Sequence, residues 1–143
     1  MLEPEIDLSF QSSQKLYCSG QFRKTLEKLT LCNQKIKKDW YQLDKFPPAD
    51  AILIIKQYSE INYLKILCLN KLGNDCCALK NIRYLYNQLR SLFLSSDLKG
   101  EIRNSLRNEL LKITQLYQRI ENISGPDNLL NDFNQIFYTK ILL

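Results

Sequence analysis

The chain has 143 residues, of which 45% are hydrophobic and 24% are charged, a balance typical of one soluble globular domain. It contains no histidine, which excludes Ser-His and Cys-His nucleophile pairs and histidine-ligated zinc. The net charge of +5 is modest for a dedicated nucleic-acid-binding domain.

The spacing of apolar residues predicts two helices in the first 43 residues. The first begins near Ile6 and Phe10, and its inward positions recur every three or four residues up to Gly20. A left-handed glycine would end the helix there. From Phe22 the same spacing continues as far as Leu43 and predicts a second, longer helix.

The stretch KFPPAD at residues 45–50 is the clearest break in the chain, because its two prolines cannot continue a helix. A third helix is expected from about residue 49 to Leu72, with Gly73 ending it. Its apolar residues lie on more than one side, as in a helix buried between neighbours.

The second half of the chain predicts three more helices. The fourth has a single apolar stripe formed by Ala78, Ile82, Leu85, Leu89 and Leu92. The fifth is expected over residues 98–123 with Ser96 or Asp97 as its cap, and a short sixth follows SGPD at residues 124–127. Strand alternation is absent, so we expect an all-α fold of about six antiparallel helices arranged as helical hairpins.

Two of the expected turns resemble each other. They are LYCSGQFRKTLEKL at residues 16–29 and LNKLGNDCCALKNI at residues 69–82. In each, a small residue follows the glycine by five positions, Thr25 after Gly20 and Ala78 after Gly73. The glycine permits a tight reversal, and the small residue allows the two helices to pack closely. We therefore treat these four residues as structural turn positions.

This pattern resembles the tetratricopeptide (TPR) repeat, a helix–turn–helix unit with a glycine at the turn and an alanine in the second helix. The match is partial, because Gly20 and Gly73 lie 53 residues apart and the family's repeat has about 34 residues. The resemblance implies a TPR-like bundle or short solenoid, with an insertion around residues 35–50. It also implies a scaffold that holds another protein, as in a multisubunit complex.

The five cysteines are odd in number and include no Cys-x-x-Cys pair, so we expect free thiols in a reducing compartment, the cytoplasm or the nucleus. The adjacent Cys76 and Cys77 are interpreted as packing residues, with thiol activation near a helix N-terminus as the alternative. We expect no metal and no cofactor.

The chain shows no signal peptide and no apolar run long enough to span a bilayer. Residues 1–143 are expected to form one domain. The abrupt end on KILL is also compatible with the N-terminal part of a longer protein. Helix number and turn placement are similar to the cytosolic domains of some tail-anchored organelle adaptors, such as the mitochondrial fission receptor and the peroxisomal receptors for AAA ATPases. That similarity implies an organelle-surface location if an anchor follows.

Lysines and aromatic residues on the second helix form the first candidate binding surface. Lys35 and Lys38 fall near one helix face, beside Trp40 and Tyr41. These four residues are candidates for contact with a partner protein. The alternative is that the basic face binds nucleic acid or an anionic membrane surface.

The fourth helix supplies the other candidates. Tyr86 and Phe93 lie seven residues apart and off the main apolar stripe, so they form a second apolar face for a partner or for the fifth helix. No paired catalytic residues or phosphate-binding loop are present. We therefore expect a non-catalytic adaptor or scaffold domain that binds another protein rather than an enzyme.

Overall fold

The computed structural model describes residues 4–95 and 100–120, with side-chain exposure from residue 8 onward. These residues form five α-helices and one short 3-10 turn, and they contain no strand. The helices are α1 (Pro4–Cys18), α2 (Phe22–Trp40), α3 (Pro48–Lys71), α4 (Asp75–Phe93) and α5 (Gly100–Ile120), and the 3-10 turn is η1 (Leu43–Lys45). The expected all-α fold is confirmed. The expected sixth helix and the Ser96 or Asp97 cap lie outside the described residues.

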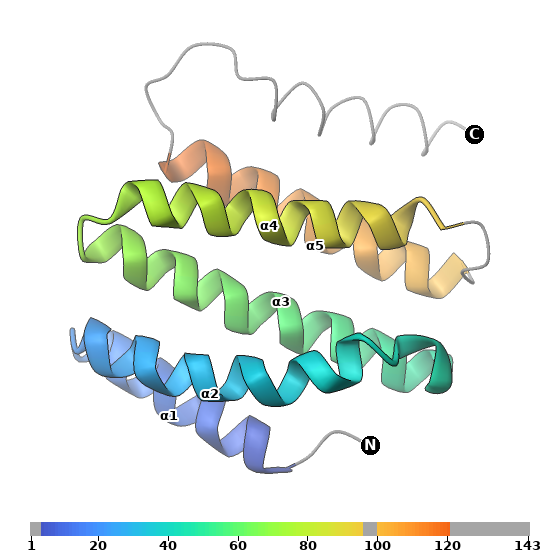
Figure 1. Ribbon diagram of the computed structural model, residues 1–143, viewed down its shortest axis with the longest axis horizontal. Coiled ribbons are helices and arrows are strands. Elements are labelled where there is room, and N and C mark those ends of the chain that lie inside the picture. Colours follow the sequence, from blue (N-terminus) through green and yellow to red (C-terminus); the bar gives the residue numbers. More distant parts are fainter. Residues whose placement is uncertain (1–3, 96–99, 121–143) are drawn as a thin grey trace.

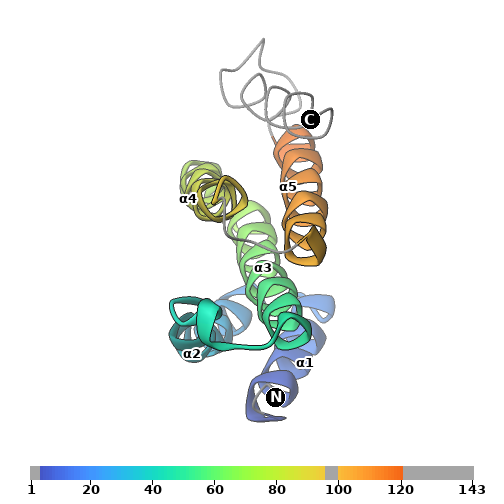
Figure 2. The ribbon, with the colours of Figure 1, turned by 90° about the vertical axis from the view of Figure 1, so that its right-hand side faces the viewer.

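The helices run back and forth as antiparallel hairpins, with α3 in the centre (Figure 1). α3 packs along α2, α4 and α5, and touches α1 only slightly. Seen end-on, α2 and α4 flank α3 on one side, whereas α1 and α5 flank it on the other (Figure 2). The molecule therefore has two different sides, separated by α3.

α3 is the core helix, as its all-round apolar character predicts. It begins with Pro48 in its first turn, where proline is tolerated because the backbone donor would have no helical partner. Its fully buried side chains come from several faces and include Ala51, Ile54, Ile55, Tyr58, Ile61, Ile66 and Cys68. A helix that buries most of its circumference serves as the support on which the others are placed.

The turns after α1 and α3 have the same backbone geometry. Gly20 and Gly73 have φ values of 80° and 77°. In the first turn the amide of Gln21 donates to the Leu16 carbonyl at 2.9 Å, and in the second Asn74 donates to Leu69 at 2.8 Å. Each glycine amide also donates to the carbonyl three residues before it. Both turns are thus Schellman motifs closed by a left-handed glycine.

The small residues after these turns lie fully inside the structure. Thr25 and Ala78 are both 0% exposed. The Thr25 hydroxyl donates to the Gln21 carbonyl at 2.7 Å, which satisfies its hydrogen within its own helix. A threonine can therefore occupy this tight position without leaving a buried donor unpaired.

The second helix differs from its expected length. α2 ends at Trp40 rather than at Leu43, and the chain turns through η1 before α3 begins. Leu43 is nevertheless buried, because the 3-10 turn keeps its side chain against the core. The apolar spacing therefore extends past the end of the helix.

Candidate functional site

A pocket of about 430 Å³ lies between the end of α2 and the second half of α4. Its wall is formed by aromatic, amide, hydroxyl and aliphatic side chains, namely Trp40, Tyr41, Tyr84, Asn87, Gln88, Ser91, Leu92 and Ser95. We call this pocket the α2–α4 groove. None of its lining side chains is an aspartate or a glutamate.

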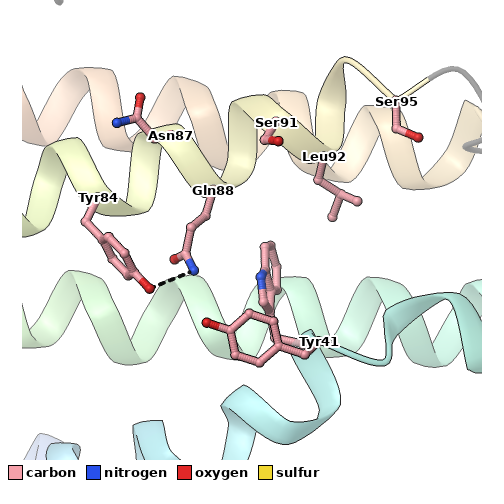
Figure 3. Close-up of a pocket in the computed structure, with 8 residues that line it drawn as sticks. Tyr41, Tyr84, Asn87, Gln88, Ser91, Leu92 and Ser95 are labelled. Carbon is pink, nitrogen blue, oxygen red and sulfur yellow. Dashed lines mark hydrogen bonds between the residues drawn. The ribbon is translucent and has the colours of Figure 1, made fainter.

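Helical spacing explains why α4 presents these residues together. Tyr84, Gln88 and Ser91 follow one another at steps of four and three, so they share one side of α4, and Ser95 lies just past the end of the helix. Tyr84 and Gln88 reach from α4 toward Tyr41 of α2 (Figure 3). α4 therefore contributes a polar face to the groove alongside its buried apolar face.

Trp40 and Tyr41 are neighbours in sequence but have different roles. Trp40 is 9% exposed, and its ring stacks on Tyr58 of α3 with ring centroids 4.5 Å apart. Tyr41 is 66% exposed. Successive residues at a helix end point about 100° apart, so the first closes the core and the second faces water.

A hydrogen-bonded chain of side chains joins α3 and α4. The Tyr58 hydroxyl donates to Gln88 Oε1, and Gln88 Nε2 donates to the Tyr84 hydroxyl at 3.2 Å. A hydrogen bond with Tyr41 raises the pKa of Tyr84, and burial adds to this effect. Burial raises the pKa of Tyr58 as well. These phenols are therefore neutral donors and acceptors at physiological pH.

Two lysines lie beside this aromatic cluster. Lys37 of α2 places its Nζ 5.7 Å from the centre of the Tyr84 ring, within the range of a cation–π contact. Lys65 of α3 is half-buried, and its pKa is lowered by burial and by the charge of Lys37. Within the described residues neither lysine forms an ion pair with a carboxylate. Neither lysine lines the groove, but Lys37 places positive charge against Tyr84, which does.

The α3 residues between α2 and α4 form one stripe. Tyr58, Asn62 and Lys65 step by four and three along α3. Asn62 Nδ2 donates to Asn33 Oδ1 of α2 at 3.2 Å and to the Tyr58 carbonyl at 2.8 Å. Asn62 therefore joins α3 to α2, and Tyr58 joins α3 to α4.

The four partner-binding candidates on the second helix and at its end have different positions in the structure. Lys35 and Lys38 are exposed on α2, but they do not line the groove. Tyr41 is exposed in the groove, whereas Trp40 is mostly core. The structure brings Trp40 and Tyr41 together with α4 and leaves the two lysines on another face.

Tyr86 and Phe93 require a correction as surface candidates. They are 1% and 5% exposed, so they are core residues and are not available to a partner. The reason is that α4 packs against both α3 and α5 and must bury a wide face. Their burial agrees with packing inside the protein, the alternative to partner binding that the sequence left open.

The main groove residues missing from the sequence-based candidates are Tyr84 and Gln88. Lys37 of α2, which contacts the Tyr84 ring from beside the groove, was also missing. The signal of Tyr84 and Gln88 was present as a second stripe on α4 that is aromatic and polar rather than apolar. That stripe is indistinguishable from an ordinary solvated helix face unless α2 is known to lie opposite it. Its significance comes from the tertiary arrangement.

The five cysteines are free thiols at different places in the structure. Cys76 is exposed and Cys77 is half-buried at the start of α4. Cys32 and Cys68 are buried, which raises the pKa of both thiols, that of Cys68 to about 11. Among residues 4–95 and 100–120, no cluster of three or more potential metal ligands occurs.

Comparison with protein-family models, with curated proteins and with solved structures gives no match for this chain. In the part of the chain that the structure describes, no helix combines the length and the apolar character needed to cross a bilayer.

Proposed function

We propose that this chain is a non-catalytic, TPR-like interaction domain that holds a segment of a partner protein in the α2–α4 groove. The observation that supports this most is the lining of the groove. Exposed Tyr41 and Tyr84 approach each other there, with the amide of Gln88 beside Tyr84, and Asn87 and Ser91 complete the polar lining.

This lining suits a polypeptide segment. Tyrosine offers a large, stiff, amphipathic surface, which is why aromatic residues dominate binding energy at protein interfaces. Side-chain amides can both donate and accept, so Asn87 and Gln88 can pair with the N–H and C=O groups of an extended backbone. A volume of about 430 Å³ falls within the usual range for ligand pockets.

The groove is also preorganised. Trp40 is held by its stacking on Tyr58, and Gln88 is held between the hydroxyls of Tyr58 and Tyr84. Side chains that are fixed before binding lose little conformational entropy when a partner arrives. A surface of this kind can select a partner segment without rearranging its helices.

The cysteines support a location for this function. All five cysteines described are free thiols, as is usual in a reducing compartment. We accordingly place the domain inside the cell, in the cytoplasm or nucleus or on an organelle surface, where it would join its partner in a larger complex.

The test is selection from a phage-displayed library of random peptides on the immobilised full chain. We expect enriched peptides to lose affinity at least about tenfold when Tyr84→Ala removes an interface aromatic, a loss of about 1.4 kcal/mol. Arg83→Ala changes the exposed neighbour of Tyr84, which does not line the groove, and is the matched control. Circular dichroism checks that both variants keep their helices.

Two outcomes would contradict the proposal. One is that no peptide sequence is enriched above an empty support. The other is that the enriched peptides bind the Tyr84→Ala and Arg83→Ala variants equally well, which would place their contact away from the groove.

A further inference from the structure

We infer that the segment held in the groove is acidic, with a carboxylate at Lys37 and Lys65 and an apolar or aromatic side chain against Trp40 and Leu92. This inference rests on the proposed function and names the chemistry of the partner. The bound segment is expected to be extended, because it must follow the groove between two helices.

The first argument is the charge of the site. Lys37 and Lys65 are close enough for the charge of one to influence the other, and both are half-buried. Within the described residues they have no carboxylate partner, and no acidic side chain lines the groove. Two like charges held in a partly dehydrated place repel each other. An incoming carboxylate would relieve that repulsion and stabilise both ammonium groups.

The second argument is the position of Lys37. Its Nζ rests over the Tyr84 ring, which is itself 47% exposed at the edge of the groove. The ammonium is therefore already directed to the place where a ligand would lie along Tyr84. A carboxylate can pair with it there while the ring contact is kept, because the cation–π contact uses only one side of the charge.

The third argument is the contrast between the two ends of the groove. Trp40 and half-buried Leu92 provide an apolar surface away from the lysines, and Ser95 lies at the same end. An apolar or aromatic side chain placed there would be removed from water. The ligand that fits both ends has a carboxylate-bearing residue and a bulky apolar residue along one strand.

The arrangement of charge favours a peptide over a nucleic acid. A nucleic acid strand presents a phosphate at every nucleotide and is bound by a continuous track of cations. Lys35 and Lys38, which would be needed to extend such a track, do not line the groove. The positive charge beside Tyr84 instead comes from Lys37, with Lys65 near it, and such a small cluster suits a few carboxylates.

The experiment compares peptide selection on the wild-type chain, on Lys37→Glu and on Lys38→Glu. Lys38 neighbours Lys37 on α2 and is exposed, whereas Lys37 is half-buried and contacts the groove residue Tyr84, so Lys38 is the matched control. We expect the wild type and Lys38→Glu to enrich peptides with Asp or Glu close to a bulky apolar residue. Lys37→Glu should lose these peptides and bind counterparts in which the acids are replaced by lysine.

Affinities of the selected peptides can be read from the fluorescence of Trp40, the single tryptophan of the chain. Charge reversal at Lys37 should weaken acidic peptides at least about tenfold at low salt, and the difference should shrink as salt is added. Lys65→Met removes the second charge with a side chain that tolerates burial, and it should give a smaller loss in the same direction.

Each contrary outcome has a distinct meaning. Selected peptides that depend on Tyr84 but show no excess of acids, or that bind Lys37→Glu unchanged, would overturn this inference and leave the proposed function standing. If no peptide is selected, both are overturned. If a single-stranded polyuridine displaces the selected peptides and depends equally on Lys37, the groove is a nucleic-acid site and the inference is wrong.

Discussion

The two sides of α3 each contain a tyrosine that reaches a neighbouring helix, and the two contacts differ in kind. On the groove side, Tyr58 donates to Gln88 of α4. On the other side, Tyr63 donates to the Glu109 carbonyl of α5 at 2.6 Å and lies 3.2 Å from Glu109 Oε2. Five residues apart on a helix, the two tyrosines point in different directions.

The contact of Tyr63 with α5 ends at a buried residue, whereas the contact of Tyr58 with α4 continues to an exposed side chain. Glu109 is 1% exposed, and Lys112 at 3.4 Å is its ion-pair partner. On the groove side the hydrogen bonds continue from Gln88 to Tyr84, which is 47% exposed. We conclude that the α5 side uses its polar groups to stabilise the fold, while the groove side leaves hydrogen-bonding capacity available to a ligand.

The largest expected effect is a difference in stability between variants of Trp40 and Tyr41. Trp40→Ala should lower the free energy of unfolding by about 3–5 kcal/mol, because it removes a buried ring stacked on Tyr58. Tyr41→Ala should change it by less than about 0.5 kcal/mol, because its side chain is mainly in water. Chemical denaturation followed by circular dichroism measures both, since Trp40→Ala removes the only tryptophan. Similar costs for the two variants would show that they share one environment.

The next effect compares the two sides of α3 directly. Tyr63→Phe removes the donor to the buried Glu109 carbonyl and should cost about 1–3 kcal/mol of stability. Tyr84→Phe removes a hydroxyl that water can replace and should cost less than about 0.5 kcal/mol. Denaturation curves of these two single-atom deletions give the comparison. The contrast between the two sides of α3 would be wrong if Tyr84→Phe lowered the free energy of unfolding as much as Tyr63→Phe.

The turns and the central helix could be predicted from the sequence because their causes are local. A glycine followed five residues later by a small residue is visible at Gly20 and Gly73 without knowledge of the fold. The all-round apolar character of residues 51–68 likewise predicts a helix with neighbours on several sides. Both depend only on residues that are close in the chain.

The groove could not be predicted because its residues come from helices far apart in sequence. The side chain of Tyr84 is exposed and that of Tyr86 is buried, although both lie off the main apolar stripe. Which of them faces solvent depends on how α4 is rotated between α3 and α5. A rotation of one residue, about 100°, exchanges core and surface, as the difference between buried Trp40 and exposed Tyr41 shows.

The smallest expected effect is a change in how stability depends on pH. Burial raises the pKa of Glu109 above its usual value near 4.5, with Lys112 and Tyr63 opposing the shift. The folded state then holds this proton more tightly than the unfolded state. Stability should therefore be lost as pH rises from the usual glutamate range through the raised pKa.

Glu109→Gln removes this titration and keeps the backbone carbonyl to which Tyr63 donates. Relative to this variant, the wild type should lose stability across that pH window and then run parallel to it at higher pH. Thermal unfolding of both proteins over a pH series measures the difference. Curves that stay parallel throughout would show that Glu109 has no raised pKa.

The most direct test of the groove as a binding site is to map a selected peptide on the isotopically labelled chain by NMR. The account predicts that the largest amide and side-chain shifts occur at Trp40, Tyr41, Tyr84 and Gln88, with little change at Tyr63 and Glu109. Shifts centred on α1 and α5, or on the Lys35 and Lys38 face of α2, would contradict it.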